Sequence, residues 1–246
     1  MLNHGDLFSG VGGFSLAASW LGWNNIFQVE NDPFCQKVLE KNFPETKRYG
    51  DIYEFKGEKY RGTIDIISGG FPCQPFSVAG KQKGKEDDRY LWPEMFRVIQ
   101  EIRPTWVVAE NVTGIISMGL DKTISDLESV GYEVQAFVIP ACAVGAWHRR
   151  DRVWIVAYSA RFRLENQVQK YERVEKLYKK RPSIALSAYI DRERFDISRD
   201  NEHLRRNSRV SNWMDRIKAL GNAIVPQVAY EIFGCIDRIE RAESEV

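Results

Sequence analysis

The sequence predicts an α/β fold with a mostly parallel sheet, and three observations support this class. Short apolar runs typical of buried strands recur over residues 1–158. Helical stretches lie between these runs, and a glycine-rich turn follows the first of them. Such alternation is typical of parallel strands joined by helical crossovers. We expect a main domain over residues 1–157, a small region over 158–212 and a C-terminal segment over 213–246.

The expected strands are the apolar runs Leu7–Phe8, Ile26–Val29, Ile64–Ile67, Trp106–Ala109, Val134–Ile139 and Val153–Ala157. Helical stretches are expected over Pro93–Ile102 and Lys122–Val130, and a further helix is expected to begin near Phe14. From Val225 onward, apolar residues recur at helical spacing on one face. This pattern predicts an amphipathic helix that packs back on the sheet.

The composition, with 43% hydrophobic and 28% charged residues, is that of an ordinary globular protein. No apolar run approaches the roughly 18 residues of a membrane span, and the first residues lack the pattern of a signal peptide. We therefore expect a cytoplasmic protein without membrane contact. The four cysteines form no CxxC pair, which argues against a metal site or a disulfide framework, and Cys35, Cys142 and Cys235 are expected to be buried thiols.

Charge is unevenly distributed, although the net charge is only +1. Residues 158–218 carry 16 Lys and Arg against 9 Asp and Glu, a balance of +7, which leaves −6 for the remainder. A basic segment on a mildly acidic body is typical of a module that meets phosphates. The alternative is a solvated charged helix, and composition alone does not decide between the two.

A glycine-rich turn is the first candidate site, in the segment Asp6–Phe14. Gly10, Gly12 and Gly13 allow a ligand to approach the backbone closely. Glu30 follows at the distance, about 20 positions, at which an acidic residue binds ribose hydroxyls. The spacing differs from GxGxxG, which disfavours a dinucleotide-dependent oxidoreductase. The turn therefore indicates a nucleoside-bearing cofactor, with a simple tight turn as the alternative.

A cysteine in a stiff loop is the second candidate site. The segment Gly69–Ser77 follows the expected strand Ile64–Ile67, so it lies at the strand end where open α/β sheets bind ligands. Pro72 and Pro75 restrict the loop around Cys73. A thiol held in this way can act as a nucleophile, whereas a lone cysteine would more often be buried in a turn.

Two charged segments complete the candidates. Glu110 follows the expected strand Trp106–Ala109, where partial burial would raise its pKa and let it act as an acid, although an exposed loop acid is the simpler interpretation. The segment His148–Arg152 enters the last expected strand, and alternation would put Arg150 and Arg152 on one side. Two guanidinium groups could hold a phosphate or a carbonyl oxygen, or form a surface charge cluster.

Taken in order, these segments resemble the DNA cytosine-C5 methyltransferase family. The matching segments are Asp6–Gly13 (the cofactor loop), Phe71–Gln74 (the catalytic motif), Glu110–Val112 (the ENV motif), His148–Arg152 (the QxRxR motif) and Gly221–Gln227 (the last motif). The resemblance covers residues 1–158 and about 213–233. It implies a Rossmann-like methyltransferase fold with a seven-stranded sheet, a catalytic and cofactor-binding domain, and a small target recognition region over 158–212.

The resemblance also implies a reaction. A methyl group would pass from S-adenosylmethionine to carbon 5 of a cytosine flipped out of double-stranded DNA, leaving S-adenosylhomocysteine, without a metal. The Cys73 thiolate would attack C6, and Glu110 would hydrogen-bond or protonate N3. Arg152 would hold O2, and Arg150 would support the site. A cognate restriction endonuclease as partner, a monomeric state and association with the nucleoid are further expectations.

Two more sets of residues follow from the resemblance. Phe8 would lie against the cofactor adenine, and Asp51 at its amino group. The whole cofactor set is Phe8, Gly10, Gly12, Gly13, Glu30, Asn31, Asp51, Ile52, Pro72, Asn222 and Ala223. The expected DNA contacts are Gln74, Ser77, Arg192, Arg194, Arg205, Arg206 and Arg209, with Arg199 as a further candidate.

The chain departs from the family pattern at three points. His148 stands where glutamine is usual, the recognition region must fit in roughly residues 158–208, and Ser208–Trp213 takes the place of the motif before the last one. Two rival functions use the same scaffold. A tRNA cytosine-C5 methyltransferase typically carries a Cys-Phe-Thr tripeptide, which is absent here. A regulatory homologue without activity would have no need of Cys73, Glu110 and Arg152 together.

Overall fold

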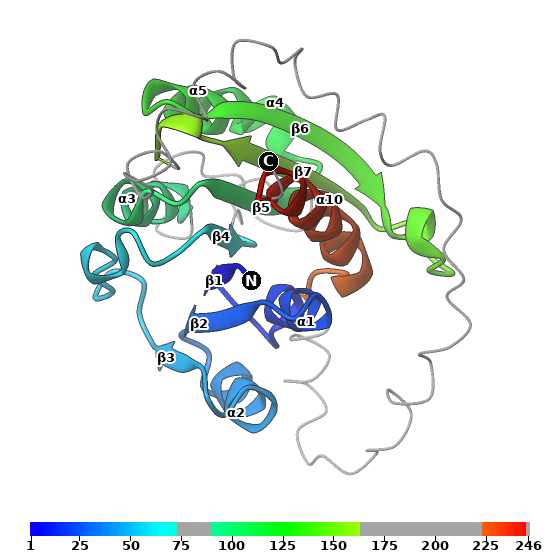
Figure 1. Ribbon diagram of the computed structural model, residues 1–246. Coiled ribbons are helices and arrows are strands. Elements are labelled where there is room, and N and C mark those ends of the chain that lie inside the picture. The colour runs from blue at the N-terminus through cyan, green and yellow to red at the C-terminus, as the bar shows by residue number, and fades with distance from the viewer. Residues whose placement is uncertain (73–89, 163–222, 245–246) are drawn as a thin grey trace.

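The computed structural model describes residues 1–72, 90–162 and 223–244. Its centre is one seven-stranded sheet in the order β3-β2-β1-β4-β5-β7-β6 (Figure 1). The strands are β1 Asn3–Leu7, β2 Asn24–Val29, β3 Lys47–Tyr49, β4 Ile66–Gly69, β5 Trp106–Val112, β6 Glu133–Pro140 and β7 Asp151–Tyr158. Several residues singled out above lie outside the described ranges, namely Cys73, Gln74, Ser77, Asn222 and the six candidate arginines between Arg192 and Arg209.

The sheet is mostly parallel, which confirms the predicted fold class. Strands β3, β2, β1, β4 and β5 run parallel to one another, and β7 pairs antiparallel with both β5 and β6. The apolar runs predict six of the strands. They miss β3, whose sequence Lys-Arg-Tyr contains no apolar run. They also misplace several boundaries. For example, β1 ends before Phe8, whose φ is 53°, β4 begins at Ile66 rather than Ile64, and β5 continues past Ala109 to Val112.

Helices cover both faces of the sheet, with α1 and α10 on one face and α3 and α5 on the other (Figure 1). Asp32 caps α2, where its carboxylate accepts hydrogen bonds from the backbone N–H groups of Phe34 and Cys35. No helix among the described residues is both long and apolar enough to span a bilayer. The helices are α1 Gly13–Trp20, α2 Pro33–Asn42, α3 Trp92–Ile102, α4 Ile115–Met118, α5 Leu120–Ser129 and α10 Pro226–Ser244, with 3-10 turns η1 Glu58–Tyr60 and η4 Ala141–Val144.

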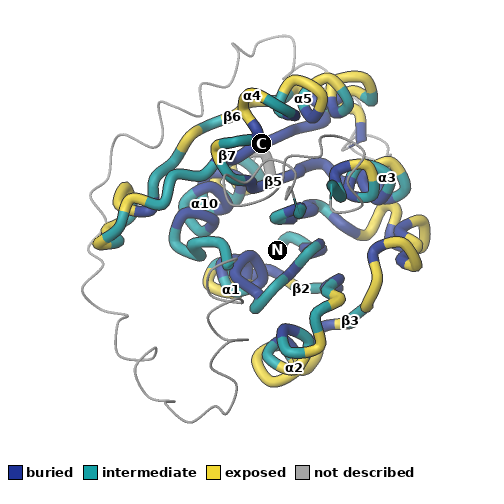
Figure 2. The backbone as a smooth tube through the Cα atoms, turned by 180° about the vertical axis from the view of Figure 1, so that it is seen from behind, coloured by how far each residue is buried: buried dark blue, intermediate teal, exposed yellow. Residues whose placement is uncertain are grey.

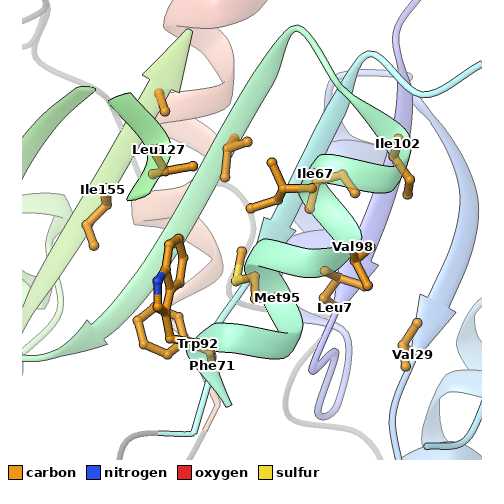
Figure 3. Close-up of a cluster of buried hydrophobic side chains, with 14 of the residues drawn as sticks. Leu7, Val29, Ile67, Phe71, Trp92, Met95, Val98, Ile102, Leu127 and Ile155 are labelled. Atoms are coloured by element: carbon orange, nitrogen blue, oxygen red, sulfur yellow. The ribbon is translucent and has the colours of Figure 1, made fainter. Parts of the chain in front are cut away.

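Two apolar clusters form the core, one on each face of the sheet. Successive residues of β5 point to opposite faces, so Val107 belongs to the cluster under α3 and Val108 to the cluster under α1 and α10. Figure 3 shows the first cluster, where Met95 of α3 packs toward the sheet beside Leu7. In the second cluster, Phe233 of α10 stacks on Trp23 with ring centroids 4.9 Å apart. Burial on both faces explains why these strands read as continuous apolar runs.

The expectation of three buried thiols is wrong at one position. Cys35 and Cys235 are buried, but Cys142 is exposed. Cys142 lies in η4, within the turn that joins β6 to β7, and this turn carries few side chains that pack on the sheet. Figure 2 shows the outer end of this hairpin as largely exposed or half-buried.

Candidate active site

The glycine-rich turn between β1 and α1 is built from left-handed backbone conformations. Phe8, Gly10 and Gly12 have φ angles of 53°, 55° and 89°. Backbone hydrogen bonds hold the turn, from Ser9 N to Val29 O (3.1 Å) and from Gly12 N to Ser9 O (2.8 Å). A side chain at Gly10 would meet no atom within 4 Å, so the space in front of this peptide is open. Gly10 therefore leaves its backbone open, whereas Gly12 and Gly13 are buried, and a Cβ at these positions would meet Phe43 and Ile224.

Glu30 lies directly beside this turn. Its carboxylate accepts hydrogen bonds from Gly10 N (2.7 Å) and from Asp32 N (2.8 Å), which links the loop after β1 to the loop after β2. Gln36 donates to the backbone carbonyl of Glu30 (2.6 Å) and fixes it further. Asn31, the next residue of the expected cofactor set, is exposed. Glu30 is thus held at the turn in a fixed orientation.

The loop after β3 brings a third part of the expected cofactor set to the same sheet edge, because Leu7, Val29 and Tyr49 end their strands in register. Asp51 is exposed, and its carboxylate accepts a hydrogen bond from the N–H of Tyr53, two residues on (3.0 Å). Ile52 is buried. These strand ends form one row next to the glycine-rich turn.

The loop after β3, which carries Ile52, is held in place by a side chain of α3. Arg97 donates to the carbonyl of Ile52 (2.8 Å) and to the carbonyl of Phe55 (3.1 Å). The same guanidinium group pairs with Glu94 and Glu101 within its own helix. No local pattern predicts this role of Arg97, because the two carbonyl groups that it binds lie more than 40 residues away along the chain.

Glu110, Arg152 and Arg150 meet at the carboxyl end of β5. The Nε atom of Arg152 lies 3.0 Å from Oε1 of Glu110, and the two side chains are only 20% and 10% exposed. Arg150 lies before β7 with a φ of 38°, so strand alternation does not orient it as predicted. Its side chain turns inward all the same and donates to the carbonyl of Ala223 (2.7 Å). The positive charge of Arg150 lowers the pKa of Glu110.

Burial raises the pKa of Glu110 to about 7, against the lowering effects of Arg152 and Arg150. The carboxyl group is therefore close to half-protonated near neutral pH and can donate a proton or a hydrogen bond. Pairing of β5 with the antiparallel β7 produces this environment, since it places Arg152 opposite Val112, two residues from Glu110. Glu110 is not the exposed loop acid that its sequence context alone would favour.

The backbone that leads to Cys73 is fastened to the same strand. Asn111 donates from Nδ2 to the carbonyl of Phe71 (3.0 Å), and its Oδ1 accepts from Val112 N (2.9 Å). A Cβ at Gly70 would lie 3.4 Å from Oε2 of Glu110, so this peptide passes against the carboxyl group. Pro72, the last described residue of this loop, accepts a hydrogen bond at its carbonyl from Leu91 N (3.2 Å).

The segment before α10 joins the two halves of the site. Ile224 packs against Gly13 of the glycine-rich turn, where a Cβ would lie 2.5 Å from Cγ1 of Ile224, and against Gly70, where the distance would be 3.7 Å. Ala223 beside it accepts the hydrogen bond from Arg150. The segment before α10 thus contacts both the glycine-rich turn and the group around Glu110.

Substituting Gly13 by alanine tests this contact. The variant should lose about 1–3 kcal/mol of stability, the usual cost of overpacking, because Ile224 has to move away from the new methyl group. Urea unfolding measures the loss, and Gly13→Ala combined with Ile224→Ala should recover part of it. Gly234→Ala is the matched control, since a Cβ there would come no nearer than 4.0 Å to any atom apart from its chain neighbours and the backbone of its own helix. An unchanged unfolding midpoint in Gly13→Ala would contradict this packing.

A buried polar network lies beneath the turn, and sequence analysis did not find it. Oδ2 of Asp6 accepts from Ser15 N (3.2 Å) and Ser15 Oγ (2.6 Å), which ties β1 to the start of α1. Oδ1 of Asp6 lies 3.4 Å from the hydroxyl of Ser68, and this hydroxyl lies 2.7 Å from Nε2 of His4. Nδ1 of His4 contacts Oδ1 of Asn25 at 2.7 Å. The chain of contacts connects three neighbouring strands and α1.

Burial shifts the two titratable groups of this network in opposite senses. It raises the pKa of Asp6 to about 7 and lowers the pKa of His4 to about 4. Because the unfolded chain releases the Asp6 proton near pH 4, and the folded chain only near pH 7, Asp6 lowers stability progressively as the pH rises across this window. His4 acts in the opposite sense between about pH 4 and 6.5.

Asp6→Asn should therefore stabilise the protein at pH 7 and above. The change in the free energy of unfolding caused by the substitution should be more favourable there than at pH 4 by on the order of a few kcal/mol. The Ser68 hydroxyl now donates to Oδ1 of Asp6 (3.4 Å), and an asparagine can keep a hydrogen bond there with either atom of its amide. Urea unfolding of both proteins at a series of pH values from 4 to 8 measures the difference. Parallel stability curves for the two proteins would show that Asp6 is ionised in the folded state.

Comparisons with known proteins agree on one family. The sequence model of the C-5 cytosine-specific DNA methylase family matches residues 2–214. The chain is 36% identical over 166 residues to the type II methyltransferase M.HhaI of Haemophilus parahaemolyticus, an alignment that covers 65% of the chain and 50% of that protein. The chain thus spans about half the length of this curated relative.

Solved structures give the same result. A prophage-encoded E. coli protein described as a DNA modification methyltransferase superposes with a TM-score of 0.55 at 30% identity, over 65% of this chain and 47% of that one. The DNMT2 of Spodoptera frugiperda superposes with a TM-score of 0.56 at 23% identity, over 65% and 51%, a likeness of fold alone. The family match extends over most of the sequence and includes the glycine-rich turn and Glu110. The chain therefore belongs to the C-5 cytosine-specific DNA methylase family.

Proposed function

We propose that this chain is a DNA (cytosine-5-)-methyltransferase that acts on double-stranded DNA with S-adenosylmethionine as methyl donor. The observation that carries the proposal is the group around Glu110. A buried carboxyl with a pKa near 7 is paired with Arg152 and lies against the peptide of Gly70, three residues before a cysteine. An acid of this pKa would suit attack by a thiolate on a cytosine ring, which needs a proton as the thiolate adds.

The residues of the cofactor set fit a nucleoside-bearing cofactor. Gly10 leaves its peptide open, and Glu30 presents a carboxylate fixed at the turn, which suits ribose hydroxyls. Phe8 and Asp51 would contact the adenine, and Gly12, Gly13, Asn31, Ile52, Pro72, Asn222 and Ala223 would line the rest of the site. When bound, S-adenosylmethionine supplies an electrophilic methyl group, and the chain contributes binding and orientation.

The reaction needs the chain to activate cytosine, whose C5 is a poor nucleophile. The Cys73 thiolate forms a bond to C6, and Glu110 places a proton or hydrogen bond at N3 as negative charge develops in the ring. Arg152 holds the base at O2 and Arg150 supports the arrangement through Ala223. After C5 gains the methyl group, a base removes the C5 proton and Cys73 leaves. The cytosine has to be flipped out of the duplex for any of these steps.

The region over residues 158–212 is proposed to recognise the DNA sequence. Its basic balance suits phosphate contacts, which position the duplex, while only a few side chains would read base edges. The proposed contacts are Gln74, Ser77, Arg192, Arg194, Arg199, Arg205, Arg206 and Arg209. A monomeric state, association with the nucleoid and a cognate restriction endonuclease belong to the same proposal.

A tritium-transfer assay tests the function. The purified chain with labelled S-adenosylmethionine should transfer label to duplex DNA and not to tRNA. Label in tRNA alone would instead assign the chain to the related tRNA cytosine-C5 methyltransferases. Cofactor binding without transfer to either nucleic acid would point to a regulatory homologue.

A further inference from the structure

The turn between β6 and β7, residues 141–150, lies at the catalytic edge of the sheet. Arg152 at the start of β7 pairs with Val112 at the carboxyl end of β5, so the turn projects from the edge where the strands that carry the candidate site end. Figure 1 shows it at the outer end of the long β6–β7 hairpin.

Backbone hydrogen bonds pin this turn. Ala141 N donates to Arg149 O (2.7 Å), and Ala146 N donates to Ala141 O (3.3 Å). Gly145 between them takes the left-handed conformation, with a φ of 84°. The residues between Ala146 and Arg149 are therefore held at both ends and presented in a fixed position.

Trp147 is at the tip of this pinned turn. Its side chain is 95% exposed, more than that of any other large hydrophobic residue among those described. The indole makes an edge-to-face contact with the His148 ring, with centroids 5.2 Å apart. Indole rings bury some 150–250 Å² when they bind and lose little conformational entropy on doing so. A rigidly held, exposed indole is therefore suited to contact a partner.

The charges around Trp147 indicate the chemistry of that partner. The Arg149 side chain is 83% exposed and is oriented by Asp151 at 2.8 Å. The next arginines along the chain, Arg150 and Arg152, turn inward to Ala223 and Glu110. A flat aromatic face and a projecting guanidinium group at the rim of the site complement a ligand with both planar groups and negative charge, which is the chemistry of a nucleic acid strand.

We propose that Trp147 packs against a nucleotide of the bound DNA beside the target cytosine, and that Arg149 contacts a phosphate of the same strand. This inference rests on the proposed function, because it assumes DNA at the edge where Glu110 lies. It adds the β6–β7 turn to the DNA surface that the proposed function assigns to the 158–212 region and to Gln74 and Ser77.

Fluorescence anisotropy with a labelled duplex, in the presence of S-adenosylhomocysteine, tests the proposal. Trp147→Ala should weaken DNA binding about 5- to 100-fold, the range for loss of one aromatic stack, and Trp147→Phe should restore most of it. Trp20→Ala is the matched control. Trp20 is 45% exposed and packs edge-on against Tyr230. It lies at the end of α1, away from the catalytic edge where that helix begins.

Salt dependence separates the two contacts. Arg149→Ala should lower the slope of log affinity against log salt concentration by about one, whereas Trp147→Ala should leave the slope unchanged. Calorimetry with S-adenosylhomocysteine should give wild-type affinity for every variant, which shows that each one is folded.

Wild-type DNA affinity in Trp147→Ala would overturn the inference and leave the proposed function intact. A wild-type chain that binds no DNA would overturn the proposed function itself. If Trp147→Ala instead abolished self-association in sedimentation and kept its DNA affinity, a second copy of the chain would be the partner, and the inference would be wrong.

Discussion

Replacing Cys73 by serine is expected to abolish methyl transfer to DNA and to leave S-adenosylmethionine binding nearly unchanged. A serine hydroxyl is not ionised near neutral pH, so it cannot add to C6 as a thiolate does. The loss should be on the order of 10³-fold or more, as for other enzymes that lose their nucleophile. The expected cofactor contacts, by contrast, come mainly from the loops after β1, β2 and β3. Tritium transfer and calorimetry measure the two effects separately.

Cys142→Ser is the matched control for this experiment. Cys142 is an exposed thiol on η4, outside the group around Glu110, and its loss should not change the rate. If Cys73→Ser retained full activity, the covalent mechanism would be wrong. A drop in both variants would indicate a general dependence on reduced thiols and no specific nucleophile.

Replacing Glu110 by glutamine is expected to lower kcat/KM by about 10²- to 10⁴-fold, the usual contribution of a positioned acid. Glutamine keeps nearly the same shape and can donate a hydrogen bond, but it cannot give up a proton. Its neutral amide also leaves Arg152 without the carboxylate that now lies 3.0 Å away. Glu128→Gln, an exposed substitution on α5, is the control and should be without effect.

The pH profile gives this prediction a second readout. Because burial raises the pKa of Glu110 to about 7, the protonated form is available below that pH and is lost above it. The wild-type rate should therefore carry a limb that falls with rising pH near 7, and Glu110→Gln should lack that limb. If the pH–rate profile of Glu110→Gln fell with the same midpoint, the titration would belong to a group other than Glu110.

Elements buried on both faces could be predicted from the sequence. Strand β5 is covered by α3 on one side and by α1 and α10 on the other, so it reads as an unbroken apolar run. Strand β3, at the sheet edge and only three residues long, gives no such signal. The C-terminal helix could be predicted for a different reason, because its one apolar face, which covers Trp23 and Phe14, gives apolar residues at helical spacing.

The candidate site could be predicted only in part, because its chemistry depends on contacts between distant residues. The sequence identifies Glu110 and Arg152 through a family pattern, but the burial that shifts the pKa of Glu110 arises from the pairing of β5 with β7. The network from Asp6 through Ser68 to His4 joins residues more than 60 positions apart and follows no local pattern. The predicted roles of Cys73 and the arginines of the 158–212 region remain predictions.

A covalent trap tests whether Cys73 forms a bond to the target cytosine. Every cytosine of a long DNA fragment can be replaced by 5-fluorocytosine, so that any short recognition site is included. After attack at C6 and methylation at C5, fluorine cannot leave as a proton does, and the cysteine stays bound. We expect a protein–DNA complex that survives denaturation, carries one added methyl group by mass spectrometry, and is absent with Cys73→Ala. A chain that methylates ordinary DNA of the same sequence but forms no such complex on the fluorinated fragment would contradict the covalent mechanism.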